Sequence, residues 1–186
     1  MKNVPNILSV SRLLISGLLL FTGNHPVIFT ILYLYCGISD VADGYIARRW
    51  KVESATGAKL DSFGDLVFYA VVTVLFFTRT ALMKDGVVLG LVLAVFILKL
   101  LNVIIIRAKF HQWGMLHTIG NKLSGLLVYF LLPVYVLFPS TPVIPGMVVV
   151  IIALAASLEE TFMLLRAKQY NPNLKSIFDN RSNRTE

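Results

Sequence analysis

Hydrophobic runs separated by short polar stretches make up most of this chain. Six of these runs are close to the roughly 20 residues that an α-helix needs to cross the hydrocarbon core of a bilayer. The pattern predicts helices at residues 6–22, 27–47, 60–79, 86–107, 119–138 and 143–165. Gly23 and Asn24 follow the first run, and the proline-rich stretch 139–146 lies between the fifth and the sixth. Helix breakers therefore mark the connection after the first helix and the connection before the last. We therefore expect an all-α bundle of six transmembrane helices.

The second and third runs reach spanning length only when their aspartates are counted. Their purely apolar parts, 27–39 and 66–77, are shorter than a span. The pattern therefore places these carboxylates at the ends of two spans, at the rim of the bilayer.

Composition supports a membrane protein. Hydrophobic residues make up 56% of the 186 positions and charged residues 15%, whereas about a quarter of the residues in a soluble domain are charged. The first run follows Lys2, contains Arg12 and lacks a small-residue cleavage site, so we expect a retained span and not a signal peptide. Residues 1–165 are predicted to form one membrane domain, and residues 166–186 a polar cytoplasmic tail.

The distribution of Lys and Arg predicts the orientation. The amino end, the 48–59 and 107–122 loops and the tail after residue 165 hold fourteen of the seventeen basic residues. By the positive-inside rule both termini are cytoplasmic, and we expect a multi-pass protein of the plasma membrane whose site faces the cytoplasm. The net charge of +7 favours anionic lipid headgroups and phosphate-bearing substrates over nucleic acid, because the basic residues are scattered among hydrophobic segments.

Four of the ten acidic residues fall within residues 39–69. Asp40 and Asp43 are three apart and Asp61 and Asp65 four apart, so each pair shares a helix face. If the two helices are neighbours, four carboxylates meet at one point and repel one another unless cations neutralise them. Oxygen ligands of this kind suit Mg²⁺ or Mn²⁺, and two such ions form a clamp for a diphosphate.

Residues around the aspartates fit a phosphate-bearing substrate. Gly44 and Gly57 leave room for a bulky polar molecule near the backbone, and Arg48 is placed to meet phosphate oxygens. The alternative is that the charged residues only anchor the spans in the headgroup region. This explanation is sufficient to account for Arg49 and Lys59. It explains the aspartates poorly, because acids at the ends of apolar spans are unfavourable and are usually functional.

The order of these residues resembles a known signature. Asp40-x-x-Asp43-Gly44-x-x-Ala47-Arg48, then eight residues, then Gly57-x-x-x-Asp61-x-x-x-Asp65, matches at all eight positions the motif of the CDP-alcohol phosphatidyltransferase family of integral membrane phospholipid synthases. The resemblance extends to the architecture, since that family has six spans with the signature running from the second into the third.

The resemblance implies a reaction and a role for each residue. A CDP-linked lipid, with CDP-diacylglycerol as the expected donor, gives its phosphatidyl group to an alcohol, and CMP leaves. The four aspartates would form a two-ion Mg²⁺ or Mn²⁺ site, Asp65 would also be the general base, and Gly44, Ala47, Arg48 and Gly57 would line the CDP-lipid site. Members of the family are commonly homodimers, so the resemblance also suggests a homodimer.

The amino end carries a weaker likeness. Pro5-Asn6-x-x-Ser9-x-x-Arg12 is similar to an opening common in the family. Asn6, Ser9 and Arg12 share a helix face and are expected to point toward the nucleotide. The alternative is a helix cap followed by a basic anchor.

Basic residues later in the chain are candidates for the acceptor site. Lys99 lies inside the fourth span and needs a partner, for which the metal site or a substrate phosphate is expected. Arg107 and Lys122 flank the next cytoplasmic turn and are predicted to contact a phosphate on the acceptor. Glu159 and Glu160 are expected to pair with basic loops.

The acceptor and the class of function both have alternatives. Glycerol 3-phosphate is the expected acceptor, with serine or inositol phosphate open, because the 120–124 segment only approximates that of family members using glycerol 3-phosphate. A cation transporter with a carboxylate ion site, or a catalytically idle membrane scaffold, would belong to other classes. Charges at the rim instead of the midplane argue against transport.

Overall fold

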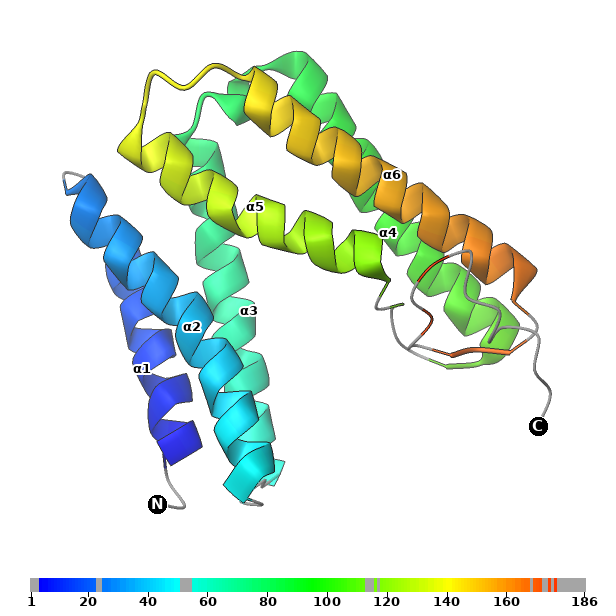
Figure 1. Cartoon of the computed structure of the whole chain (residues 1–186), viewed down its shortest axis with the longest axis horizontal. Helices are drawn as coiled ribbons and strands as arrows, with labels where there is room; N and C mark the ends of the chain where they lie inside the picture. The colour runs from blue at the N-terminus through cyan, green and yellow to red at the C-terminus, as the bar shows by residue number, and fades with distance from the viewer. Residues whose placement is uncertain are drawn as a thin grey trace. The chain divides into compact units, whose positions relative to one another are not determined.

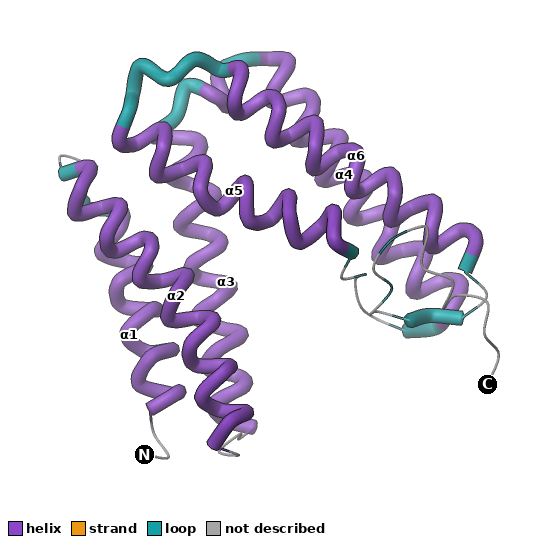
Figure 2. The backbone as a smooth tube through the Cα atoms, in the orientation of Figure 1, coloured by secondary structure: helices purple, strands orange, loops and turns teal. Residues whose placement is uncertain are grey.

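The computed structural model is built from α-helices, and its described part contains no strand (Figures 1 and 2). It describes residues 4–22, 25–50, 55–112, 116, 118–167, 169–171, 174 and 176. The elements are α1 (Val4–Leu19), α2 (Pro26–Trp50), α3 (Ala55–Arg79), the short 3-10 helix η1 (Leu82–Lys84), α4 (Gly86–Phe110), α5 (Ile119–Leu137) and α6 (Ile144–Arg166). The predicted all-α class and the six predicted helices are confirmed.

The largest difference from the expected boundaries lies between α2 and α3. Helix α2 continues to Trp50 and α3 begins at Ala55, so most of the predicted 48–59 loop is helical; residues 51–54 lie outside the described part. Alanine, arginine and lysine supply five of the eight helical residues in this stretch, and these residue types favour helix even where the chain becomes polar. Polarity therefore marked the end of the apolar run but not the end of the helix.

Four helices are long and apolar enough to cross a membrane. They are Pro26–Ile46, Gly86–Phe110, Ile119–Leu137 and Ile144–Arg166. In α1 the apolar part, Asn6–Leu19, is shorter, and the described part of α3 is not among the four. Many large hydrophobic side chains on the helices are exposed, among them Leu14, Ile38, Leu66 and Phe96, as expected of surfaces that face lipid. Crossing by α1 and α3 stays a prediction.

The chain divides into two compact units. The amino-terminal unit comprises Met1–Thr80 and Leu132–Thr141, and the carboxy-terminal unit comprises Ala81–Leu131 and Pro142–Glu186. In the amino-terminal unit α1 packs against both α2 and α3 (Figure 2). The ring of Tyr33 on α2 lies 5.5 Å from that of Phe68 on α3, between centroids. These contacts bring the acidic segments of α2 and α3 together beside α1.

In the carboxy-terminal unit α4 packs along α6. A buried hydrophobic cluster joins the end of α4 to that of α6 and includes Ile106, Leu116, Met163, Leu164 and Leu174. Leu174 and the partly buried Tyr170 belong to the segment predicted as a polar tail, so its described residues pack in part against the helices.

Candidate functional site

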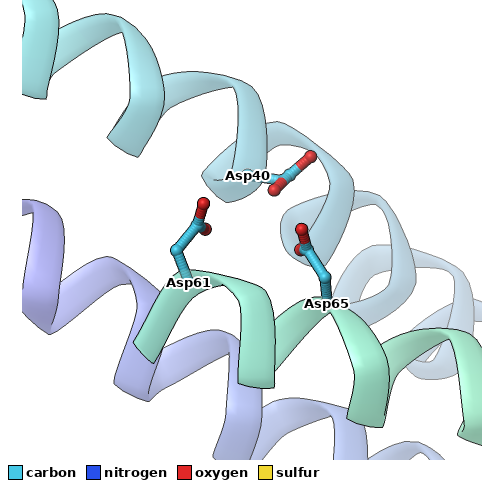
Figure 3. Close-up of side chains that lie close together, drawn as sticks. All are labelled: Asp40, Asp61 and Asp65. Atoms are coloured by element: carbon cyan, nitrogen blue, oxygen red, sulfur yellow. The ribbon is translucent and has the colours of Figure 1, made fainter. Parts of the chain in front are cut away.

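The four aspartates of the sequence motif converge within the amino-terminal unit. Asp40 comes from α2, and Asp61 and Asp65 come from α3, and Figure 3 shows these three side chains pointing toward one another across the space between the two helices. Each of the three offers a carboxylate oxygen that lies within 4.8 Å of the others. The spacing in the sequence predicted this meeting of two acidic helix faces.

Asp43 occupies a different environment from the other three. Its side chain is buried, at 4% exposure, whereas those of Asp40, Asp61 and Asp65 are 44, 41 and 38% exposed. The hydroxyl of Ser9 on α1 donates a hydrogen bond of 3.0 Å to Asp43 Oδ2. Asp43 is therefore fixed from the α1 side, while the other three carboxylates remain accessible to a ligand.

A cation from α1 lies among the carboxylates. The guanidinium group of Arg12 forms ion pairs with Asp40, with Asp61, with Asp65 at 3.2 Å and with Asp43 at 3.6 Å. The whole residue is buried. Sequence reasoning placed Arg12 near the nucleotide and did not connect it with the aspartates, although its helix face, shared with Ser9, was identified.

The charge and chemistry of this cluster suit divalent cations. Four carboxylates against one guanidinium leave an excess of three negative charges if all four are ionised, and like charges this close together are unfavourable without further cations. Carboxylate oxygens are hard ligands of the type that Mg²⁺ and Mn²⁺ prefer. The donor set therefore fits a divalent metal, and the partial exposure of three donors leaves them open to it.

The residues expected to line the CDP-lipid site lie on both sides of the aspartates. Gly44 directly follows Asp43 in α2, and Gly57 lies one helical turn before Asp61 in α3; both are half-buried. Ala47 and Arg48 continue the helical backbone of α2, and their side chains lie outside the described part.

Asn6 lies in the first turns of α1, where it lines a shallow groove with Ile7, Val10 and Ser11. Neither of the two roles considered for Asn6, a nucleotide contact or a helix cap, is tested by this placement.

Lys99 has a partner inside the carboxy-terminal unit. Its Nζ donates to Glu160 Oε2 at 2.6 Å and to Asn121 Oδ1 at 2.8 Å. The buried Glu160 also accepts from Asn121 Nδ2 at 2.9 Å and from the backbone N–H of Leu116 at 3.2 Å. Glu160 therefore pairs with Lys99 of α4 and not with a basic loop, which corrects that expectation, whereas binding of a substrate phosphate by Lys99 is not tested. The two charges neutralise each other between α4 and α6.

The other acceptor candidates also belong to the carboxy-terminal unit. Arg107 is exposed and its Nη1 donates to the backbone carbonyl of His111 at 3.0 Å; Lys122 is exposed near the start of α5. Contact of Lys99, Arg107 or Lys122 with an acceptor stays a prediction.

The helices and the acidic cluster define an integral membrane protein with a carboxylate site suited to divalent cations. A family model described as CDP-alcohol phosphatidyltransferase matches residues 2–159, which include Arg12 and all four aspartates. The chain belongs to this family.

Several curated proteins are similar to part of the chain. A CDP-diacylglycerol--glycerol-3-phosphate 3-phosphatidyltransferase of Aquifex aeolicus is 33% identical over 84 residues, which are 43% of this chain and 47% of the relative. A protein of the same description from Rickettsia typhi is 32% identical over 92 residues, 47% of this chain and 49% of the relative. A cardiolipin synthase (CMP-forming) / mitochondrial hydrolase fusion protein of Schizosaccharomyces pombe is 34% identical over 73 residues, 38% of this chain and 12% of the relative.

The matched region therefore spans about half the length of the two bacterial relatives and a small part of the fusion protein. No solved structure matches the chain significantly.

Proposed function

We propose that the protein transfers the phosphatidyl group of CDP-diacylglycerol to the hydroxyl of a small alcohol and releases CMP, as a step of phospholipid biosynthesis. The observation that carries this proposal is the convergence of Asp40, Asp43, Asp61 and Asp65 from two helices within the region that matches the family. Glycerol 3-phosphate is the proposed acceptor.

The similarity to relatives named for glycerol 3-phosphate supports this choice of acceptor. Exposed basic side chains at Arg107 and Lys122 suit an acceptor that carries a phosphate. Serine and inositol phosphate are the alternatives from the sequence.

The four aspartates would hold two divalent ions, Mg²⁺ or Mn²⁺. Bound there, the ions would supply Lewis-acid polarisation of the phosphoryl oxygens and stabilise charge on the departing CMP. Asp65, at 38% exposure, is accessible enough to accept the proton of the acceptor hydroxyl. As that oxygen bonds to the phosphorus that carries the diacylglycerol, the bond from this phosphorus to the CMP oxygen breaks.

The remaining signature residues would position the donor. Gly44 and Gly57 would leave space beside the backbone for the cytidine diphosphate, and Arg48 would pair with its phosphate oxygens. Orientation of two substrates against each other is itself a large part of catalysis in such transfers. The acyl chains would stay in the bilayer while the water-soluble alcohol arrives from the cytoplasm. A homodimer in the plasma membrane belongs to the same proposal.

Release of CMP by the purified full-length protein tests the function. The assay contains CDP-diacylglycerol, Mg²⁺ or Mn²⁺, and in turn glycerol 3-phosphate, serine or inositol phosphate. We expect glycerol 3-phosphate to stimulate CMP release, and a chelator to abolish it because the carboxylates then lack their counter-ions. Stimulation by another alcohol would correct the acceptor.

Absence of CMP release with every alcohol would contradict the proposal. If no alcohol stimulates CMP release, uptake of divalent cations by proteoliposomes that contain the protein would favour the cation transporter. Absence of uptake would favour a membrane scaffold. Lys84→Gln, at the end of η1 and outside the signature, is the control for substitutions within the signature. This variant should retain wild-type CMP release.

A further inference from the structure

Arg12 is buried in a place that is costly for a cation without partners. Residue exposure is 0%, although arginine is rarely buried fully unless it is paired. Its two terminal nitrogens divide the aspartates between them: Nη1 faces Asp40 and Asp65, and Nη2 faces Asp61 and Asp43. One guanidinium thus contacts every carboxylate of the site.

The surroundings of Arg12 are shaped to admit the guanidinium. A Cβ atom at Gly64 on α3 would stand 3.4 Å from both Nε and Nη2 of Arg12, which is contact distance, so the guanidinium leaves little room there for a branched side chain. The Nε atom is buried and has no hydrogen-bond partner among the described residues. A buried donor without a partner is unfavourable, so this arrangement does not satisfy every polar group of the guanidinium.

The carboxylates that Arg12 contacts are those that a metal would need. Asp40, Asp61 and Asp65 form the group whose oxygens lie within 4.8 Å of one another, and Arg12 pairs with each of them. A divalent ion bound by the same oxygens would have to share or replace these ion pairs, and it would stand close to a fixed positive charge. Both effects oppose binding of the ion.

We infer that Arg12 is a resident counter-cation of the aspartate site, which holds the four carboxylates together and competes with the divalent metal for them. This inference rests on the proposed function for the identity of the metal site. It gives Arg12 a role different from the nucleotide contact expected from the sequence. The guanidinium lowers the repulsion among the aspartates without saturating them, so the site remains folded when metal is scarce and binds metal less tightly than four unopposed carboxylates would.

Mn²⁺ binding to the purified full-length protein tests this role, measured by electron paramagnetic resonance or calorimetry. Arg12→Gln is expected to lower the dissociation constant for Mn²⁺ by about tenfold, since a charge at this distance shifts carboxylate equilibria by one or more powers of ten. Arg12→Lys keeps the charge and should stay closer to the wild type. Arg79→Gln, at the opposite end of α3 from the aspartates, is the control and should leave Mn²⁺ binding unchanged.

Thermal unfolding with and without chelator gives a second readout. With EDTA, Arg12→Gln should unfold at a lower temperature than the wild type, and Mn²⁺ should raise its melting temperature by more than it raises that of the wild type. The double variant Arg12→Gln with Asp61→Asn should recover part of the loss in EDTA, because one uncompensated carboxylate has been removed. A packing role for Arg12 would not give this recovery.

If Arg12→Gln does not fold, Gly64→Val replaces it, with Gly64→Ala as its control. The added methyl groups should displace the guanidinium and tighten Mn²⁺ binding, whereas alanine, at ordinary contact distance, should not. Unchanged or weaker Mn²⁺ binding in the variants, or no recovery in the double variant, would overturn the inference. The proposed function is decided separately by CMP release from the wild type.

Discussion

Individual residues of the acidic cluster differ in what they can do. Asp43 is buried and bonded to Ser9, which suits a carboxylate that fixes geometry. Asp65 is partly exposed and lies near Asp40 and Asp61, so a hydroxyl group can reach it and its proton affinity is sensitive to the charges beside it. This difference in burial supports Asp65, and argues against Asp43, as the general base of the proposed reaction.

Asp65→Asn tests the base at the residue scale. An amide cannot take the proton of the acceptor hydroxyl, so we expect CMP release to fall by at least about a hundredfold, the usual contribution of general base catalysis. The measurements are CMP release at saturating Mg²⁺ and the melting temperature, which should stay close to that of the wild type. Asp61→Asn is the comparison, and its activity should recover in part as Mg²⁺ is raised. Near wild-type turnover by Asp65→Asn would show that the base lies elsewhere.

Helices are the scale at which the sequence was most informative. Hydrophobic runs and helix breakers are local signals, so the six helices could be predicted, together with the meeting of the two acidic faces. Contacts between side chains that are far apart in the sequence could not be predicted. Lys99 and Glu160 are 61 positions apart, and their contact depends on how α4 packs along α6. The position of Arg12 likewise depends on α1 packing against both α2 and α3.

The Lys99–Glu160 pair is predicted to stabilise the packing of the helices in the carboxy-terminal unit. Removing one partner leaves the other charge uncompensated, which destabilises proteins by about 3–5 kcal/mol for buried pairs. Because the side chain of Lys99 is 31% exposed, we expect the lower end, about 3 kcal/mol, for Glu160→Gln or Lys99→Met. The measurement is thermal unfolding in detergent.

A double variant separates the ion pair from simple packing. Lys99→Met combined with Glu160→Gln should be more stable than the sum of the single effects implies, because no charge is left unpaired. Glu159→Gln, at the neighbouring and less buried carboxylate, is the control and should have a smaller effect. Additive losses in the double variant would show that the two side chains do not act as a pair.

For the whole molecule, the distribution of charge and the exposed hydrophobic surface both bear on how the protein lies in the membrane. Exposed hydrophobic side chains on the helices indicate contact with lipid, while basic residues gather near the chain ends, within residues 48–59, and at the end of α4 and the start of α5. The substrates proposed here combine acyl chains with a water-soluble headgroup, so an enzyme acting on them needs both kinds of surface. Orientation then decides from which side of the membrane the soluble alcohol reaches the site.

Labelling of single cysteines tests the predicted orientation. The free Cys36 is buried and is first replaced by serine. Gln112→Cys and Ser140→Cys are then introduced at exposed positions in the connections that precede and follow α5. In right-side-out membrane vesicles, a membrane-impermeant maleimide should label the Ser140→Cys variant at once and the Gln112→Cys variant only after permeabilisation, because α5 carries the chain from the cytoplasmic side to the opposite side. The reverse pattern would place the connection between α4 and α5, and the basic residues of the two helices that flank it, outside. An active site that faces the cytoplasm would then be untenable.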